Sequence, residues 1–211
     1  MTGTLVKICG ISTPETLAAA IGSGASHVGF VHFAKSPRHL TLADAGRLRA
    51  AVPAHVKAVL LLVNSSREVL AEAIRTVMPD VVQFHGSETP DTLARFHAET
   101  GIEAWRALAV KDAADLAEAA RFRGTADRVL LDAPASSLPG GNGTAFDWSL
   151  LAGWQAPLAW GLAGGLTPAN VAEAIRLTRA PLVDTSSGVE SAPGVKDVDR
   201  IAAFCKAALN V

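Results

Sequence analysis

Several apolar runs in the sequence end in a polar residue of a type that carries out chemistry. "LVKIC" ends in the thiol of Cys9, "DVVQFH" in the imidazole of His85 and "RVLLD" in the carboxyl group of Asp132, while "PLVDT" carries Asp184. Polar groups in otherwise apolar strands need either hydrogen-bonding partners or a functional role. A free cysteine can also act as a small buried hydrophobe, so Cys9 by itself has two interpretations, packing and chemistry.

Two glycine-rich stretches follow late apolar runs. "LAGGLTPANV" contains Gly164 and Gly165, and "VDTSSGVESAPGVKD" contains Ser186, Ser187 and Gly188. Glycine allows the backbone to approach a ligand closely, and exposed backbone amides bind anions. Either stretch alone could be an ordinary turn. Two of them after consecutive strands predict a binding site for a phosphorylated ligand.

A single arginine stands in a loop that follows the second apolar run. In "KSPRHL", Pro37 fixes the backbone just before Arg38. A guanidinium matches a carboxylate in a bidentate fashion, so we expect Arg38 to project at the site and to bind a carboxylate of the ligand. The alternative is a solvated surface arginine.

The candidate site residues can act together only if the fold brings the ends of several strands to one place. Eight short apolar runs alternate with segments of helical periodicity. Thr13, Ser66, Thr89 and Thr167 each precede a helical segment and are expected to be N-caps. Strands are predicted at 5–9, 27–33, 56–63, 80–85, 103–110, 128–132, 158–163 and 181–185, and helical segments at 14–21, 42–51, 67–77, 90–99, 113–122, 148–153, 168–177 and 198–209.

Strands that alternate with helices pair in parallel through right-handed crossovers. Eight such units predict an α/β fold, a (β/α)8 TIM barrel that forms a single domain over residues 1–211. An open doubly wound sheet would favour a glycine-rich nucleotide loop after the first strand, where "CGISTPE" stands instead. Barrel active sites lie at the C-terminal ends of the strands, and phosphate commonly binds after strands seven and eight.

The two-residue period of a strand predicts which side chains point into the barrel together. Lys7 shares a face with Cys9, and Gln83 shares one with His85. Closure of the barrel places Asp184 beside the first strand. Lys7 and Asp184 therefore form either a structural ion pair in the interior or a direct contact with substrate.

The bulk composition excludes several classes of protein. The chain has 211 residues, of which 49% are hydrophobic, and its formal net charge is −1. That charge does not suit a nucleic-acid-binding surface. No apolar run reaches the ~18 residues of a membrane span, and the opening residues do not resemble a signal peptide. Cys9 and Cys205 predict neither a disulfide scaffold nor a zinc site. We expect a cytoplasmic protein without nucleic-acid or membrane partners, in which Cys205 has a packing role.

Seven segments together resemble the phosphoribosylanthranilate isomerase family, from residue 5 to about residue 205. They are "VKICGI", "GFVHFAKSPR", "VQFHG", "LLD", "GGNGTAFDW", "LAGGLTPANV" and "VDTSSGVE". Three positions depart from the pattern of the family. His32 stands where phenylalanine is expected, Asn142 where threonine is usual and Thr185 where valine is usual.

The resemblance implies an Amadori rearrangement of N-(5-phosphoribosyl)anthranilate to 1-(2-carboxyphenylamino)-1-deoxyribulose 5-phosphate in tryptophan biosynthesis. It assigns the general base to Cys9 and the general acid to Asp132, and it places His85 and Gly143 along the site. No cofactor and no metal are expected, because the imine intermediate is itself the electron sink. We expect a bell-shaped pH profile, with the lower limb set by Cys9 and the upper limb by Asp132.

Two alternatives use the same fold. A pentose-phosphate epimerase would hold a metal between paired histidines and acids, but we expect His32 and His85 to lack acidic partners at ligand spacing. A non-catalytic phosphosugar-binding protein would lack the acid or the base, and both are present. The sequence is compatible with a monomer or a homodimer and leaves open turnover of a related substrate from histidine biosynthesis.

Overall fold

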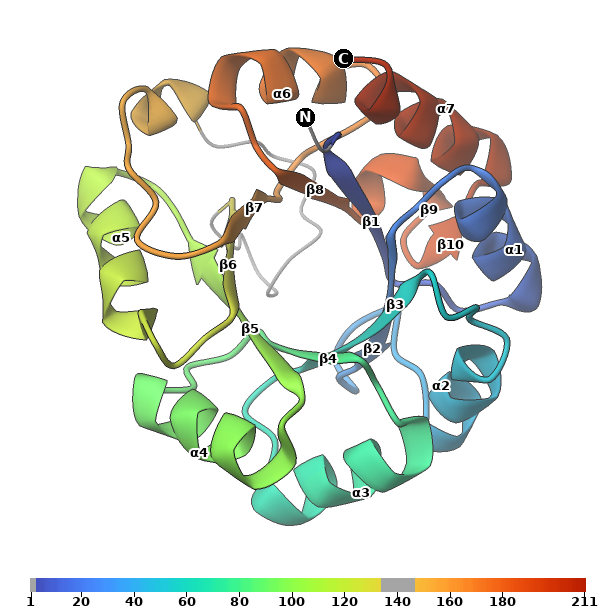
Figure 1. Cartoon of the computed structure of the whole chain (residues 1–211). Helices are drawn as coiled ribbons and strands as arrows, with labels where there is room; N and C mark the ends of the chain where they lie inside the picture. The colour runs from blue at the N-terminus through green and yellow to red at the C-terminus, as the bar shows by residue number, and fades with distance from the viewer. Residues whose placement is uncertain (1–2, 134–146) are drawn as a thin grey trace.

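The computed structural model describes residues 3–133 and 147–211, and it contains a closed barrel of eight parallel strands. The strands follow one another around the barrel in chain order, and β1 closes the ring by pairing with β8. Figure 1 looks along the barrel and shows the helices arranged as a ring outside the strands. The predicted TIM-barrel fold is confirmed.

The helices and strands lie close to their predicted positions. The barrel strands are β1 Leu5–Cys9, β2 His27–His32, β3 Lys57–Leu62, β4 Val81–Phe84, β5 Glu103–Ala109, β6 Arg128–Asp132, β7 Trp160–Leu162 and β8 Leu182–Thr185. The helices are α1 Pro14–Gly22, α2 Leu42–Arg49, α3 Arg67–Val77, α4 Pro90–Thr100, α5 Ala113–Ala117, α6 Val171–Thr178 and α7 Val198–Leu209, with 3-10 turns η1 Glu118–Phe122, η2 Trp148–Leu151 and η3 Ser187–Val189.

Three of the four predicted caps begin a helix. The side chains of Thr13, Ser66 and Thr89 each accept a hydrogen bond from a backbone amide in the first turn of α1, α3 and α4. Such a bond satisfies one of the amides that a helix start leaves without a partner. The sequence therefore predicts the starts of these helices to the residue.

The predicted start of the helix after β7 is wrong. The helix begins at Val171, and Thr167 does not cap it. Instead the Thr167 amide donates to Oδ1 of Asn170 at 2.8 Å, and Nδ2 of Asn170 donates to the Gly165 carbonyl at 3.0 Å. The asparagine side chain thus satisfies backbone groups on both sides of a turn, and the turn takes up the residues that were expected to form the first helical turn.

Side chains fill the barrel interior except at the carboxyl ends of the strands. A cluster of inward-facing residues closes the middle of the barrel, while the larger core lies between strands and helices. The interior cluster comprises Val59, Val81, Trp105, Ala107, Leu130 and Leu182. Cys205 is fully buried on α7 in the outer core, as its predicted packing role requires.

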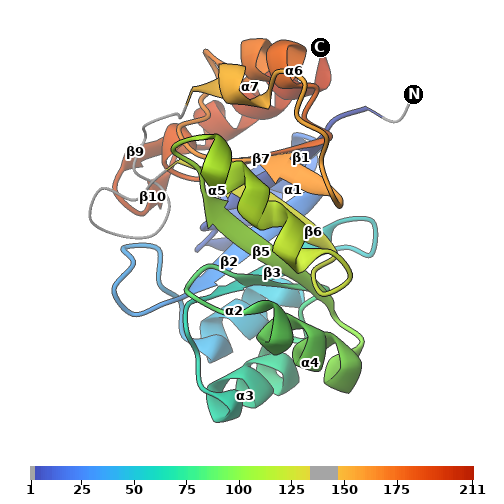
Figure 2. The same ribbon diagram turned by 90° about the vertical axis from the view of Figure 1, so that its left-hand side faces the viewer.

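A short antiparallel hairpin, β9 Glu190–Ala192 with β10 Val195–Lys196, was not predicted. The segment is only a few residues long and contains Pro193 and Gly194, so it has the composition of a loop. In Figure 2 the hairpin lies at the opposite end of the barrel from the N-terminus, at the end where the strands finish. This position brings Glu190 and Lys196 to the face that carries the site.

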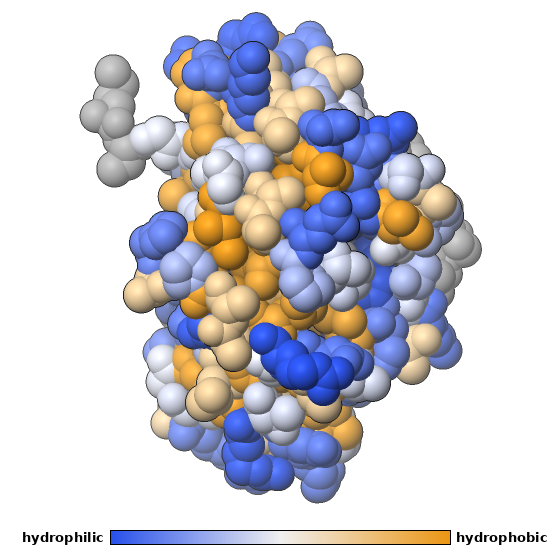
Figure 3. All heavy atoms as spheres, turned by 90° about the vertical axis from the view of Figure 1, so that its right-hand side faces the viewer, coloured by the Kyte–Doolittle hydropathy of each residue, from blue (hydrophilic) through white to orange (hydrophobic). Residues whose placement is uncertain are grey.

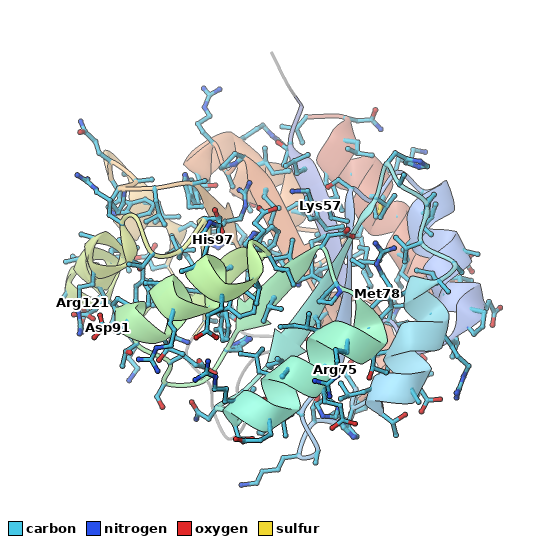
Figure 4. All side chains as sticks on the ribbon, turned by 60° about the horizontal axis from the view of Figure 1, so that its bottom comes forward. Lys57, Arg75, Met78, Asp91, His97 and Arg121 are labelled. Carbon is cyan, nitrogen blue, oxygen red and sulfur yellow. The ribbon has the colours of Figure 1, made fainter. Side chains whose placement is uncertain are left out.

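The outer surface is of mixed polarity. Figure 3 shows hydrophilic and hydrophobic groups interspersed over one side of the molecule. At the end where the strands begin, Lys57 forms an ion pair with Glu103, and His97 lies 3.5 Å from Asp127; Lys57 and His97 are labelled in Figure 4. Within residues 3–133 and 147–211, no helix is both long and apolar enough to span a membrane.

Candidate active site

A cavity opens at the carboxyl ends of the strands. It gathers every predicted site residue that the structure describes. These residues are Cys9, Arg38, His85, Asp132, Gly164, Gly165, Ser186, Ser187 and Gly188, and Asp184 and Thr185 also line the cavity. Gly143 and Asn142 lie outside the described residues.

The thiol of Cys9 lies at the end of β1, beside Gly29 of the neighbouring strand. A Cβ at Gly29 would lie 3.0 Å from the sulfur, so this glycine leaves room for the thiol. Burial raises the pKa of Cys9 above its ordinary value of 9.0, although Lys7 and Lys196 act in the opposite direction. Desolvation penalises the thiolate and outweighs the effect of both lysines.

One pleat deeper, Lys7 and Asp184 form the interior ion pair that was one of the two predicted possibilities. Nζ of Lys7 lies 2.9 and 3.0 Å from the two carboxylate oxygens of Asp184, and Lys7 is fully buried. The residues are direct partners in the register of β1 with β8. Lys7 lowers the pKa of Cys9, and Asp184 raises it and so offsets part of that effect.

Asp132 ends β6 with a buried carboxyl group. Burial and the nearby Asp184 raise its pKa from 3.8 to about 7. The Ala133 amide donates to the carboxyl group and opposes this shift, but it does not outweigh burial. At neutral pH the group is therefore poised between its acid and its carboxylate, as the sequence-based assignment of a general acid requires.

An imidazole faces the same carboxyl group. Nε2 of His85 lies 3.5 Å from Oδ2 of Asp132, and Nε2 of Gln83 lies 3.3 Å from Nδ1 of His85. Burial, together with Lys7 and Arg106, lowers the pKa of His85 to about 4, so the ring is neutral at pH 7. Asp132 is thus one acidic neighbour of His85, whereas the expectation concerned acidic partners converging at metal-ligand spacing. Within residues 3–133 and 147–211, no three metal-ligating side chains converge.

The two glycine-rich loops present unpaired backbone amides to the cavity. Gly164 and Gly165 have φ of 79° and 64°, a region that favours glycine. A Cβ at Gly188 would lie 1.9 Å from the Leu166 carbonyl oxygen, so the loops pack too closely for any side chain there. The amides of Gly164, Gly165 and Gly188 donate to no acceptor within the described part of the chain. Such amides are suited to an anion.

Thr185, one of the departures from the family pattern, ties these loops together. Its hydroxyl donates to the Leu166 carbonyl at 2.7 Å. The bond joins the end of β8 to the segment after β7, and Thr185 is buried. This hydroxyl therefore has a structural partner and is satisfied without a ligand.

Arg38 lines the cavity but does not project freely into it. Its Nε and Nη2 donate to Oε1 and Oε2 of Glu190 at 2.7 and 2.8 Å, and only 9% of the residue is exposed. Nζ of Lys196 donates to Oε1 of Glu190 at 2.6 Å and to the Ser186 carbonyl at 3.0 Å. The interpretation of a solvated arginine is wrong. Sequence reasoning also missed Glu190 and Lys196, although both charges stand within the second glycine-rich stretch, in "VESAPGVK".

A closed barrel whose cavity gathers a buried thiol, a carboxyl group poised near neutrality and two glycine-rich loops is suited to acid–base chemistry on an anionic ligand. The family model for N-(5'-phosphoribosyl)anthranilate isomerase matches residues 6–207. The N-(5'-phosphoribosyl)anthranilate isomerase of Erythrobacter litoralis is 61% identical over 207 residues, covering 98% of this chain and 99% of the relative. The chain belongs to the N-(5'-phosphoribosyl)anthranilate isomerase family, and it is an isomerase of tryptophan biosynthesis.

Solved structures agree with this assignment. The phosphoribosyl anthranilate isomerase of Thermotoga maritima superposes with a TM-score of 0.90 at 37% identity, covering 99% of this chain and all of the other. A family structure in complex with reduced 1-(o-carboxyphenylamino)-1-deoxyribulose 5-phosphate superposes with a TM-score of 0.87 at 36% identity over the same shares of the two chains. A further structure describes the Thermotoga maritima enzyme as dimeric, with a TM-score of 0.86.

Proposed function

We propose that the reaction of the family, the Amadori rearrangement of N-(5'-phosphoribosyl)anthranilate, proceeds here with Asp132 as general acid and Cys9 as general base. One observation carries the proposal: the thiol and a carboxyl group whose pKa is raised to about 7 line the same cavity. A general acid needs a proton at working pH, and an ordinary aspartate would hold almost none. The environment of Asp132 supplies this property.

In the first step, protonated Asp132 donates its proton to the ring oxygen of the ribose. The bond between C1 and that oxygen breaks, the oxygen becomes the C4 hydroxyl group, and the lone pair of the N–H nitrogen forms a protonated imine with C1. Asp132 is left as a carboxylate. The neighbouring imidazole of His85 is neutral, so it does not add a positive charge that would hold Asp132 ionised beforehand.

In the second step, the thiolate of Cys9 removes the proton from C2. The electrons of the C2–H bond form the C1–C2 double bond, and the imine nitrogen accepts the displaced pair. The resulting enolamine takes a proton at C1 and loses the C2 hydroxyl proton to give the ketone. Burial makes the thiolate of Cys9 scarce but strongly basic, and a strong base is needed to remove a proton from carbon.

The remaining residues of the cavity hold the two ends of the substrate. The unpaired amides of Gly164, Gly165 and Gly188 support phosphate binding, together with Ser186 and Ser187 on the same loop. Arg38 keeps three of its five N–H donors free of Glu190, which supports binding of the anthranilate carboxylate. We place the reaction in the cytoplasm, in a monomer or a homodimer, with residues 1–211 as one functional domain.

An activity assay tests the proposal. Purified protein is incubated with N-(5'-phosphoribosyl)anthranilate in the presence of a chelator, and loss of substrate is followed. Cys9→Ala and Asp132→Asn should each reduce kcat by about 10²–10⁴-fold, the usual contribution of a positioned acid or base. Cys205→Ala is the matched control, because that thiol is buried on α7 away from the cavity. If Cys9→Ala folds and keeps more than about a tenth of the activity, another group is the base.

A further inference from the structure

Glu190 receives more hydrogen bonds than an ordinary ion-pair partner. Oε1 accepts from Nε of Arg38 and from Nζ of Lys196, while Oε2 accepts from Nη2 of Arg38 and from the Gly194 amide at 3.2 Å. Four donors from three residues thus converge on one carboxylate, and only 7% of Glu190 is exposed. Burial alone would raise the pKa of Glu190, but Arg38 and Lys196 outweigh it and lower that pKa. The group is therefore a carboxylate at neutral pH.

This arrangement restricts the arginine to one orientation. A guanidinium offers two edges that can grip a carboxylate, one formed by Nε with one terminal nitrogen and one formed by the two terminal nitrogens. Glu190 occupies the first edge. Nη1 donates no hydrogen bond within residues 3–133 and 147–211, and Arg38 lines the cavity. The second edge is therefore the one available to a ligand.

The backbone next to the thiol accommodates the arginine. A Cβ at Gly10 would lie 2.7 Å from Cδ of Arg38, so the residue after Cys9 must be very small for Arg38 to lie where it does. Lys196 continues the network to the phosphate loop, because its ammonium group also donates to the Ser186 carbonyl. Glu190 thus joins the residues proposed for the two ends of the substrate.

We propose that Glu190 is a positioning residue that sets the specificity of the site for a carboxylate-bearing substrate, by holding Arg38 so that its terminal edge faces the ligand. The inference rests on the proposed role of Arg38. Glu190 itself does not touch the substrate. It acts by fixing the guanidinium in advance, so that little side-chain freedom is lost on binding.

Glutamine cannot replace Glu190 in this role. Each carboxylate oxygen accepts from two donors, so whichever way the amide is turned, its NH₂ group faces two other donors. Aspartate is one methylene shorter and cannot keep the same contacts without backbone movement. Glu190→Gln therefore releases Arg38 while preserving the size of the side chain.

The test measures the preference for the carboxyl group directly. The probes are reduced 1-(o-carboxyphenylamino)-1-deoxyribulose 5-phosphate and the same molecule without its carboxyl group, with Kd determined by calorimetry. The wild type should bind the first about 10- to 100-fold more tightly, the range expected for hydrogen bonds to a charged group. Arg38→Ala should bring this ratio close to 1, and Glu190→Gln should reduce it at least severalfold. General damage to the site would weaken both probes alike and leave the ratio unchanged.

Glu99→Gln is the matched control, because Glu99 also pairs with an arginine, Arg67, but on the exposed helix surface. It should keep the wild-type ratio. If Arg38→Ala loses the preference while folded Glu190→Gln keeps it, the inference about Glu190 is wrong and the role of Arg38 stands. A wild-type ratio near 1 would instead overturn the role of Arg38 itself.

A second measurement needs no variant and covers the case in which Glu190→Gln does not fold. In a crystal structure of the wild type with the carboxylated probe, Glu190 should still bind Nε and Nη2 of Arg38, and the ligand carboxylate should bind the terminal edge. A ligand that displaces Glu190 from Nε would make Glu190 a competitor of the substrate and would overturn the proposal.

Discussion

The ammonium group of Lys7 and the carboxylate of Asp184 form a buried ion pair directly below the thiol of Cys9, with Nζ 2.9 and 3.0 Å from the two oxygens. Removing one partner of a buried pair leaves an uncompensated charge and costs about 3–5 kcal/mol. We expect Lys7→Met to lower the free energy of unfolding by about that amount. The measurement is urea denaturation at pH 7.

A double variant distinguishes the cost of an unpaired buried charge from the cost of lost side-chain packing. Lys7→Met with Asp184→Leu leaves no unpaired charge and should recover most of the lost stability. Its activity should stay low, because Lys7 lowers the pKa of Cys9 and its loss makes the thiolate scarcer still. A double variant that is as unstable as Lys7→Met would show that packing, and not the unpaired charge, causes the loss.

The pH dependence of kcat/KM should reverse the order expected from the sequence. The pKa of Asp132 is raised to about 7, while that of Cys9 is raised above 9.0, so the lower limb reflects Asp132 and the upper limb Cys9. The reactive form, with a protonated acid and a thiolate, is then present in at most about 1 molecule in 100. We expect a flat region from about pH 7 up to the pKa of the thiol.

Asp132→Asn tests the assignment of the lower limb to Asp132 and the upper limb to Cys9. In this variant the residual rate depends on the thiolate alone, so it should keep rising with pH across the region where the wild type is flat. A wild-type rate that itself rises steadily from pH 7 to 9 would contradict the reversed order.

The same carboxyl group should make the fold less stable at higher pH. The pKa of Asp132 is 3.8 when unfolded and about 7 when folded. A pKa raised in the folded state gives stability that is fully present below pH 4 and is lost as pH rises through 7, here about 4 kcal/mol. The asparagine of Asp132→Asn cannot ionise, so this variant should not lose stability in this way as the pH rises. The difference in unfolding free energy between this variant and the wild type should therefore grow from pH 4 to 7 and then level off; a constant difference would contradict the raised pKa.

The sequence predicted well the features that depend on N-cap residues and on the two-residue period of strands. The cap residues Thr13, Ser66 and Thr89, the inward faces of the strands and the Lys7–Asp184 pairing follow from spacing and from closure of the barrel. The site residues are brought together because barrel strands end on one face.

What the sequence missed depends on contacts between distant segments, on competing local hydrogen bonds and on the depth of burial. Glu190 follows Arg38 by 152 positions, and no local pattern indicates that the two side chains meet. The start of α6 was misplaced because the Asn170 side chain competes with the helix for backbone groups. The pKa order of Cys9 and Asp132 depends on how deeply each group is buried. The pattern of a strand indicates which of its faces is buried but not how deeply each side chain lies.

The second glycine loop leaves no room for a side chain at Gly188. A Cβ at Gly188 would lie 1.9 Å from the Leu166 carbonyl oxygen and 2.9 Å from Oγ1 of Thr185, so Gly188→Ala must push the two loops apart. The unpaired amides would then no longer converge, and we expect the inhibition constant of inorganic phosphate to rise about tenfold or more, equivalent to at least ~1.4 kcal/mol. Gly22→Ala is the control, because a Cβ there meets no atom within 4 Å. It should leave phosphate inhibition unchanged. Circular dichroism confirms that both variants fold, and if folded Gly188→Ala binds phosphate as the wild type does, the phosphate site lies elsewhere in the cavity.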